Sequence, residues 1–126
     1  MFENTNAYSG FAVDDVQKAK EFYGEILGVR TSVLDEDLGL ITLHLADGRD
    51  TLVYQKPDLE PANYTILNFV VDDIEKAVDE LSERGVTFER YDGIEQDERG
   101  IARDAGPDIA WFKDPAGNIL AVHTEV

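Results

Sequence analysis

The sequence predicts an α+β fold of two tandem βαβββ modules, and three observations lead to it. The chain has 126 residues, of which 43% are hydrophobic, so it is large enough for one domain with a buried core. The segment VDDVQKA at residues 13–19 recurs as VDDIEKA at residues 71–77, which indicates an internal duplication. Each copy follows an apolar segment and precedes residues of alternating polarity. We therefore expect one domain over residues 1–126, with module one at 5–57, module two at 63–126 and helices covering one face of the sheets.

Each module has one predicted helix, with an aspartate as its N-cap and a glycine that ends it. Asp15 and Gly28 take these roles in the first helix, and Asp73 and Gly85 take them in the second. The apolar positions between them follow the spacing of one helix face. These positions are Val16, Ala19, Tyr23, Ile26 and Leu27 in the first helix, and Ile74, Ala77, Val78 and Leu81 in the second.

Strands are predicted where the hydrophobic period changes to two. Residues 40–45 and 51–55 form a predicted hairpin around the turn residues Asp47 and Gly48. In module two the predicted strands are residues 86–91, 108–112 and 119–124, with a turn at residues 114–118. Residues 92–107 are too polar for a core, so we expect a loop or ragged strand there that acts as a lid, and residues 56–63 form the linker between modules.

The composition excludes several classes of protein. Cysteine is absent, which removes disulfide scaffolds, thiol catalysis and cysteine-based metal sites. The formal net charge of -16 repels phosphate backbones, so no nucleic-acid partner is expected. The negative charge has two interpretations. It forms a solvated acidic surface, as in proteins of a cell with a salty cytoplasm, or it attracts a cationic ligand. No apolar stretch is long enough for a membrane span and the first ten residues do not resemble a signal peptide, so we expect a cytoplasmic protein without a membrane partner.

Two motifs carry a resemblance to a known superfamily. Residues 13–23 read VDDVQKAKEFY and residues 112–118 read FKDPAGN. Together with the duplicated βαβββ plan, they resemble the vicinal oxygen chelate superfamily, which includes glyoxalase I, extradiol dioxygenases, fosfomycin-resistance transferases and bleomycin-binding proteins. The resemblance implies that the strands of the modules form a cupped sheet with the helices outside, and that the protein is a homodimer. It specifies the activity poorly, because this fold carries lyases, isomerases, dioxygenases and metal-free binders.

Strand alternation within this implied cup selects the candidate ligand-binding residues. Apolar residues such as Phe11, Ile41 and Leu43 suit the helix-covered face, which leaves their neighbours on the concave face. Aromatic rings with a few polar groups describe a small-molecule pocket. The alternatives are that each ring is ordinary core and that His44 is a surface histidine. The predicted ligand-binding residues are Tyr8, Thr42, His44, Tyr54, Asn68, Trp111 and His123.

The residues do not match the metal site that the resemblance implies. Metal-dependent members place His or Gln seven residues before the capping aspartate, where this chain has Tyr8 and Ile66. They place a glutamate in the last strand, where this chain has Ala121, and Leu52 or Tyr54 stands in the equivalent place of module one. We therefore expect no metal and no cofactor. A displaced cluster of His44, His123 and Glu125 is the alternative.

The sequence supports two main hypotheses. The first is a metal-free protein that binds an aromatic or cationic small molecule. The second is a lyase, isomerase or dioxygenase with a displaced metal, or with a metal-free acid–base site for which His44 and His123 are weak catalytic candidates. No serine motif supports nucleophilic catalysis, since Ser9 and Ser82 have no histidine nearby by spacing. A third possibility is an interaction domain without a small ligand.

Overall fold

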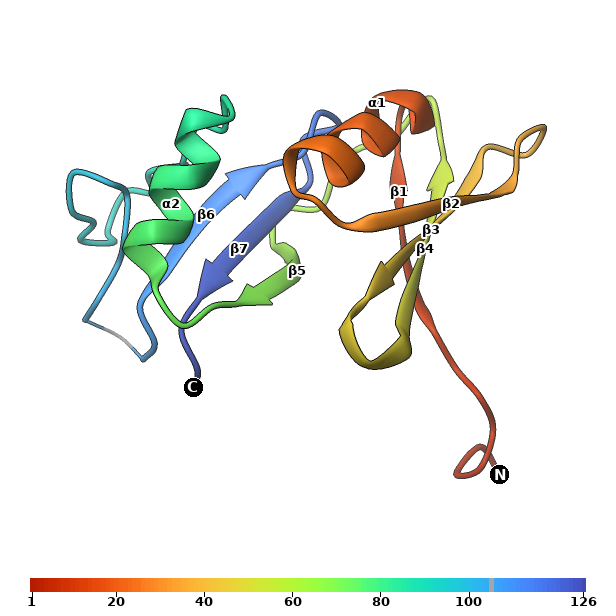
Figure 1. Cartoon of the computed structure of the whole chain (residues 1–126), viewed down its shortest axis with the longest axis horizontal. Helices are drawn as coiled ribbons and strands as arrows, with labels where there is room; N and C mark the ends of the chain where they lie inside the picture. The colour runs from red at the N-terminus through yellow and green to blue at the C-terminus, as the bar shows by residue number, and fades with distance from the viewer. Residues whose placement is uncertain (105) are drawn as a thin grey trace. The chain divides into compact units, whose positions relative to one another are not determined.

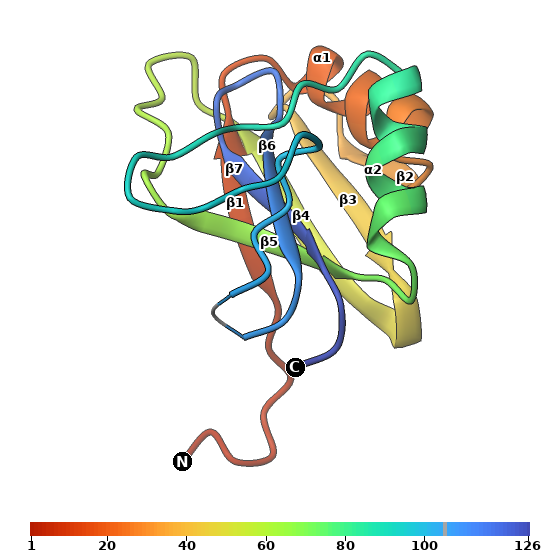
Figure 2. The ribbon, with the colours of Figure 1, turned by 90° about the vertical axis from the view of Figure 1, so that its left-hand side faces the viewer.

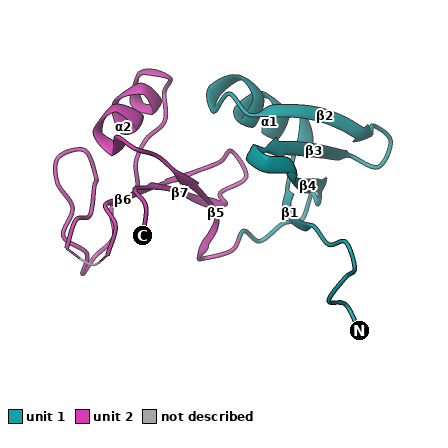
Figure 3. Cartoon of the chain, turned by 60° about the horizontal axis from the view of Figure 1, so that its bottom comes forward, with its two compact units in different colours: residues 1–61 teal, residues 62–126 magenta. Residues whose placement is uncertain are grey.

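The chain has an α+β fold whose described residues, 1–104 and 106–126, form two compact units. The computed structural model divides it into unit one, Met1–Pro61, and unit two, Ala62–Val126 (Figures 1 and 3). Each unit contains one sheet and one α-helix that follows the first strand. The α+β class that the duplicated sequence predicts is confirmed.

Unit one contains a four-stranded sheet in the order β1-β4-β3-β2. The first strand pairs in parallel with β4, and the other pairings are antiparallel. A π-helix, η1, continues the α-helix, and a short 3-10 helix, η2, joins β3 to β4. The elements are β1 (Ser9–Val13), α1 (Val16–Glu21), η1 (Phe22–Ile26), β2 (Arg30–Asp35), β3 (Leu40–Leu45), η2 (Ala46–Gly48) and β4 (Arg49–Gln55).

The helix of unit one begins as expected and ends differently. The Asp15 carboxylate accepts hydrogen bonds from the N–H groups of Gln17 and Lys18 at 3.0 and 3.2 Å, which confirms the predicted N-cap. The expected continuous α-helix is wrong after Glu21, because the chain widens into the π-helix and the Leu27 N–H reaches back to the Phe22 carbonyl. Tyr23 lies in this π-helix and is fully buried, with its ring 5.7 Å from that of Phe11 on β1.

Unit two contains a three-stranded sheet in the order β5-β7-β6. Its first strand again pairs in parallel with the last, and β6 pairs antiparallel with β7. Helix α2 lies against the sheet of its own unit, with Ile74 and Val78 buried (Figures 1 and 2). The elements are β5 (Thr65–Val70), α2 (Ile74–Glu83), β6 (Ile109–Lys113) and β7 (Ile119–His123). Over the described residues, neither unit has a helix with the length and apolar character needed to cross a membrane.

The strand expected over residues 86–91 is wrong, because only Phe88 forms a bridge, to Phe112. The amide of Gln96 takes the place of a strand partner at this edge. Its oxygen accepts from the Tyr91 N–H at 2.9 Å, and its nitrogen donates to the Glu89 carbonyl at 2.9 Å. The backbone groups beyond the bridge are therefore satisfied by a side chain and not by a continuous ladder.

The polar segment of residues 92–107 contributes to the core, against expectation. Ile101 and Ala102 are buried, and the backbone of Ala102 exchanges two hydrogen bonds with Ile109 of β6. The segment therefore packs with the sheet through two apolar residues that its charged neighbours obscure in the sequence. Ala105, which falls within the expected loop, lies outside the described residues.

Candidate functional site

The candidate residues of unit one share a sheet face that we call open face one. The register pairs Thr42 with Leu52 and places Tyr54 opposite Leu40, while the alternate residues Ile41, Leu43 and Val53 are buried. Paired residues in adjacent strands point to the same side, so Thr42, His44, Leu52 and Tyr54 lie on the face opposite that core, as alternation predicts. Tyr8 precedes β1 and is 73% exposed, so the strand does not place its side chain on this face.

His44 is the centre of a hydrogen-bonded chain on open face one. Its Nε2 lies 2.7 Å from Ser32 Oγ, and its Nδ1 lies 3.0 Å from Asp50 Oδ1. Asp50 pairs directly with His44 across β3 and β4, and Ser32 comes from β2. The sequence analysis identified His44 but missed Ser32 and Asp50, since their proximity depends on the register of β2 and on the length of β4.

The candidate residues of unit two share a second face, which we call open face two. Trp111 of β6 pairs with Ala121 of β7, which in turn pairs with Asn68 of β5. His123 lies two residues along β7, so it shares this side of the strand. Phe112 and Leu120 point to the opposite side and are fully buried there. The register therefore brings Asn68, Trp111 and His123 onto one face of their unit.

Tyr91 is a residue of open face two that the sequence analysis missed. Its ring lies 5.5 Å from the Trp111 ring at an interplanar angle of 73°, in an edge-to-face arrangement. Its hydroxyl is buried, and none of the described residues gives it a hydrogen-bond partner. Burial and the nearby Glu89 carboxylate both raise the pKa of the Tyr91 hydroxyl. No local signal in the sequence indicates this placement, because residues 89–91 do not continue the bridge that Phe88 forms with Phe112.

His123 is held by its own backbone neighbourhood. Its Nδ1 lies 2.6 Å from the Thr124 carbonyl oxygen, which can only accept a hydrogen bond. Nδ1 therefore carries a proton, and the ring is oriented by this contact. Within the described part of the chain, His123 belongs to no group of three His, Asp or Glu side chains that could hold a metal.

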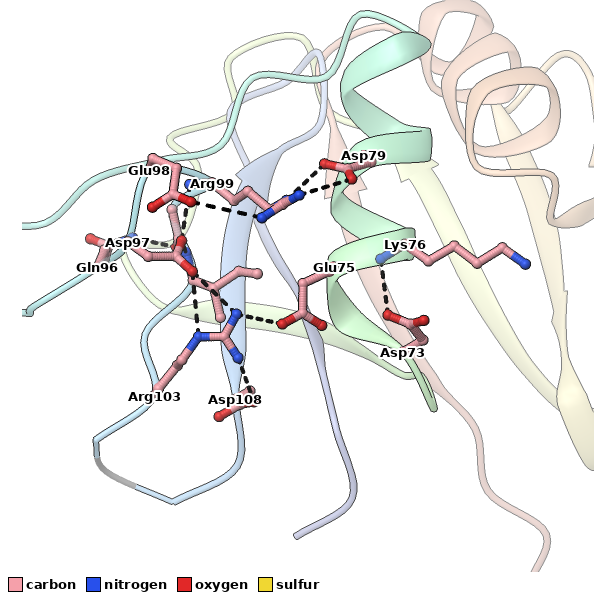
Figure 4. A network of polar contacts seen from close by, with 12 residues as sticks. Asp73, Glu75, Lys76, Asp79, Gln96, Asp97, Glu98, Arg99, Arg103 and Asp108 are labelled. Atoms are coloured by element: carbon pink, nitrogen blue, oxygen red, sulfur yellow. Dashed lines mark hydrogen bonds and ion pairs between the residues drawn. The ribbon is translucent and has the colours of Figure 1, made fainter.

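Two arginines tie the segment after Tyr91 to the rest of unit two (Figure 4). Arg99 pairs with both carboxylate oxygens of Asp79 on α2, at 2.9 and 3.3 Å. Arg103 contacts three carboxylates: Glu75 of α2 at 2.6 Å, Asp97 of the segment at 3.2 Å and Asp108 before β6 at 2.9 Å. The segment is thus fastened to the helix and sheet of its own unit, and its movement as a lid stays a prediction.

These contacts shift the protonation of the carboxyls. The hydrogen bond from Arg103 lowers the pKa of the Glu75 carboxyl. Burial raises the pKa of the Asp97 carboxyl, but hydrogen bonds from the N–H groups of Ile101 and Arg99, together with the same guanidinium, outweigh burial and lower it. The contribution of these two carboxylates to folding stability is therefore complete above their ordinary pKa values, about 3.9 for Asp and about 4.3 for Glu. It is lost as the pH falls through the lowered values.

Replacing Arg103 with glutamine is expected to destabilise unit two at pH 7 and to have a smaller effect as the pH falls below the ordinary carboxyl pKa values and through the lowered ones. Urea unfolding of both proteins at several pH values, followed by Trp111 fluorescence, measures the difference. Arg49→Gln is the matched control, because its pair with Asp47 is long, at 4.0 Å, and both side chains are highly exposed. Equal pH dependence in the two variants would contradict a role for Arg103 in fastening the segment.

A family model named Glyoxalase/Bleomycin resistance protein/Dioxygenase superfamily matches residues 7–122. The chain belongs to this superfamily. The match spans both units and both helices, and it ends one residue before His123. Among curated proteins, none matches the chain.

Several solved structures have the same fold as this chain. A superfamily member from Sphaerobacter thermophilus has a TM-score of 0.66 and 27% identity, covering 95% of this chain and 98% of that one. TnmS3, an antibiotic-binding protein from a Streptomyces species, has a TM-score of 0.69 and 21% identity, with 98% of each chain covered. A glyoxalase/dioxygenase from Nostoc punctiforme has a TM-score of 0.69 and 16% identity, covering 99% of this chain and 94% of that one. Because their identities to this chain are 21% and 16%, the similarities to TnmS3 and to the Nostoc protein show a shared fold and nothing more.

The residues present do not fit the metal centre implied for metal-dependent members of the superfamily. A divalent cation needs about three nitrogen or oxygen donors that converge on it. Ile66 and Ala121 have no donor atom in their side chains, and Ala121 is fully buried on β7. Within residues 1–104 and 106–126, no three His, Asp or Glu side chains are grouped to hold a metal. The alternative cluster joins His44 of unit one to His123 and Glu125 of unit two and stays a prediction.

Proposed function

We propose that this superfamily member binds a small aromatic or cationic molecule, without the divalent metal of its metal-dependent relatives. The observation that carries the proposal is the Tyr91–Trp111 pair on open face two. A half-buried indole and an adjacent buried hydroxyl combine a stacking surface with a hydrogen-bond donor.

The Tyr91 hydroxyl, which has no hydrogen-bond partner within residues 1–104 and 106–126, supports a polar ligand atom near Trp111. A buried hydroxyl without a hydrogen bond costs about 1–3 kcal/mol. A carbonyl or ether oxygen of a bound molecule would accept from it and remove that cost. The ligand we propose therefore places an oxygen acceptor beside the Tyr91 hydroxyl and an apolar or cationic ring against Trp111.

Charge favours a cationic guest over an anionic one. The chain carries a formal net charge of -16, which attracts cations over a long range. On open face two, Glu89 and Lys113 form an ion pair at 3.3 Å next to the ring pair, so the Lys113 charge is offset locally. An indole face and offset charges suit the binding of a cation, because ring quadrupoles attract positive charge.

The similarity to TnmS3 places one antibiotic-binding protein among the proteins of this fold. Ligand binding is the function we propose for this chain, with Thr42, His44 and Tyr54 as contacts on open face one and Asn68 and His123 on open face two. Tyr8 is proposed as a contact at the edge of open face one. The homodimer and the cytoplasmic location belong to the same proposal.

Titration with a panel of cationic glycopeptides and aromatic compounds is expected to change the fluorescence of Trp111 and to saturate for at least one compound. Trp111 is the only tryptophan, so the signal reports open face two. For that compound, Tyr91→Phe is expected to weaken binding by about tenfold, the effect of one lost hydrogen bond, without lowering stability. Fluorescence titration and urea unfolding of the same samples measure both effects.

Tyr64→Phe is the matched control, because Tyr64 belongs to unit two but is 66% exposed. It is expected to leave affinity unchanged. A flat response across the panel would count against a binding function.

Metal analysis of protein purified without chelator tests the enzyme alternative. One bound Ni, Zn, Fe or Mn per chain would overturn the metal-free proposal and favour a lyase, isomerase or dioxygenase.

A further inference from the structure

We propose that Ser32, His44 and Asp50 form a nucleophilic site for carboxylic esters on open face one. This activity goes beyond ligand binding and uses residues of unit one only. The three side chains are connected in the order hydroxyl, imidazole and carboxylate, at 2.7 and 3.0 Å. Both distances lie within the range in which a base activates a hydroxyl and a third group orients the base.

The partners of His44 determine which nitrogen carries its proton. An ionised carboxylate only accepts hydrogen bonds, so Nδ1 of the neutral imidazole donates to Asp50. Nε2 is then the acceptor of the Ser32 hydroxyl proton. This tautomer is the one that a histidine needs to act as a general base toward a serine.

The strand register explains why this arrangement is held in place. His44 and Asp50 are direct partners across β3 and β4, a position that brings Cβ atoms to about 4.5–5.5 Å. Ser32 is the diagonal neighbour of His44, because His44 pairs with Arg30 two residues before the serine. All three groups therefore lie on rigid strands, which position reacting groups more precisely than loops.

Substrate access and charge stabilisation come from β2. Ser32 is exposed, so an ester carbonyl can approach its Oγ from solvent. Arg30 is in register with His44 on the same face, and we assign its guanidinium the role of stabilising the developing negative charge on the carbonyl oxygen. Asp50 does not touch the substrate and serves as a positioning residue for His44.

The reaction balances without any cofactor. Ser32 Oγ bonds to the carbonyl carbon while its proton passes to His44 Nε2, and the carbon–oxygen bond to the alcohol then breaks as His44 returns that proton to the leaving oxygen. Water, activated by His44 in the same way, then attacks the acyl-serine. The products are the carboxylic acid and free Ser32.

A fluorophosphonate probe tests the site directly. Phosphonylation forms an Oγ–P bond, breaks the P–F bond and releases fluoride, while the proton leaves through His44. Peptide mass analysis after trypsin is expected to find the label on residues 31–49, a peptide whose only serine is Ser32. The labelling rate is expected to fall by about a hundredfold in His44→Gln, the scale of general-base catalysis, and to vanish in Ser32→Ala.

Variants of Asp50 show whether this residue positions the His44 ring for catalysis or contributes only to the packing of the strands. Asp50→Asn is expected to slow labelling at least tenfold at unchanged circular dichroism, because an amide no longer enforces the tautomer, while Asp50→Glu retains most of the rate. Ser82→Ala, which removes an exposed serine of α2, is the control and is expected to label as the parent does. Absent labelling of residues 31–49, or labelling that His44→Gln and Asp50→Asn leave unchanged, overturns the proposal. A flat Trp111 titration would leave the labelling result standing, so the two proposals fail separately.

Discussion

Replacing Phe112 with alanine is expected to lower the free energy of unfolding by about 3–5 kcal/mol, the usual cost of emptying a buried phenylalanine site. Phe112 is fully buried on β6, with its ring 5.6 Å from that of Phe88. Its neighbour Trp111 points to open face two, so the same strand carries both the core of unit two and the proposed ligand contact. Urea unfolding followed by circular dichroism and Trp111 fluorescence measures the loss.

Phe2→Ala makes the same chemical change at a residue that is 75% exposed and outside the strands. Its effect is expected to stay within about 0.5 kcal/mol. If both variants lost similar stability, the assignment of Phe112 to the core side of β6 would be wrong, and with it the placement of Trp111 on the other side.

The parts of the fold that are determined locally could be predicted from the sequence. The caps Asp15 and Asp73 were predictable because an N-cap depends on hydrogen bonds to N–H groups two or three residues away. The faces of Thr42 and Trp111 were predictable because alternation along a strand is a local property. The π-helix after Glu21 was missed, since the apolar spacing over this short stretch is compatible with either helix type.

The parts that depend on contacts between distant segments could not be predicted. Residues 86–91 have the composition of a strand, and only the placement of the Gln96 amide shows why their pairing stops. The same limit applies to the candidate sites. Ser32 reaches His44 through the register of β2, and the burial of the Tyr91 hydroxyl without a partner among the described residues depends on tertiary packing. Pairing of this kind is a property of the folded sheet and not of spacing along the chain.

The turn between β6 and β7 depends on one buried carboxylate. Asp114 is 4% exposed, and its Oδ1 accepts hydrogen bonds from the N–H groups of Ala116 and Asn118, both at 2.9 Å. Its Oδ2 accepts from the side-chain amide of Asn118 at 3.0 Å. Gly117 has a φ of 93°, which a glycine adopts without strain. This arrangement confirms the turn predicted at residues 114–118.

Asp114→Ala is therefore expected to cost about 3 kcal/mol, because it leaves three donors in a buried turn without this acceptor. Asp114→Asn should cost less, since its amide oxygen still accepts from the two backbone N–H groups but its NH₂ opposes that of Asn118. Urea unfolding gives both values. The control Asp92→Ala, at an exposed aspartate of the same unit, should change stability by no more than about 0.5 kcal/mol.

The turn also sets the register that pairs Trp111 with Ala121, so affinity for a ligand at Trp111 should fall in Asp114→Ala even where the protein remains folded. Full stability in Asp114→Ala would show that the turn is held by the strands and not by its carboxylate.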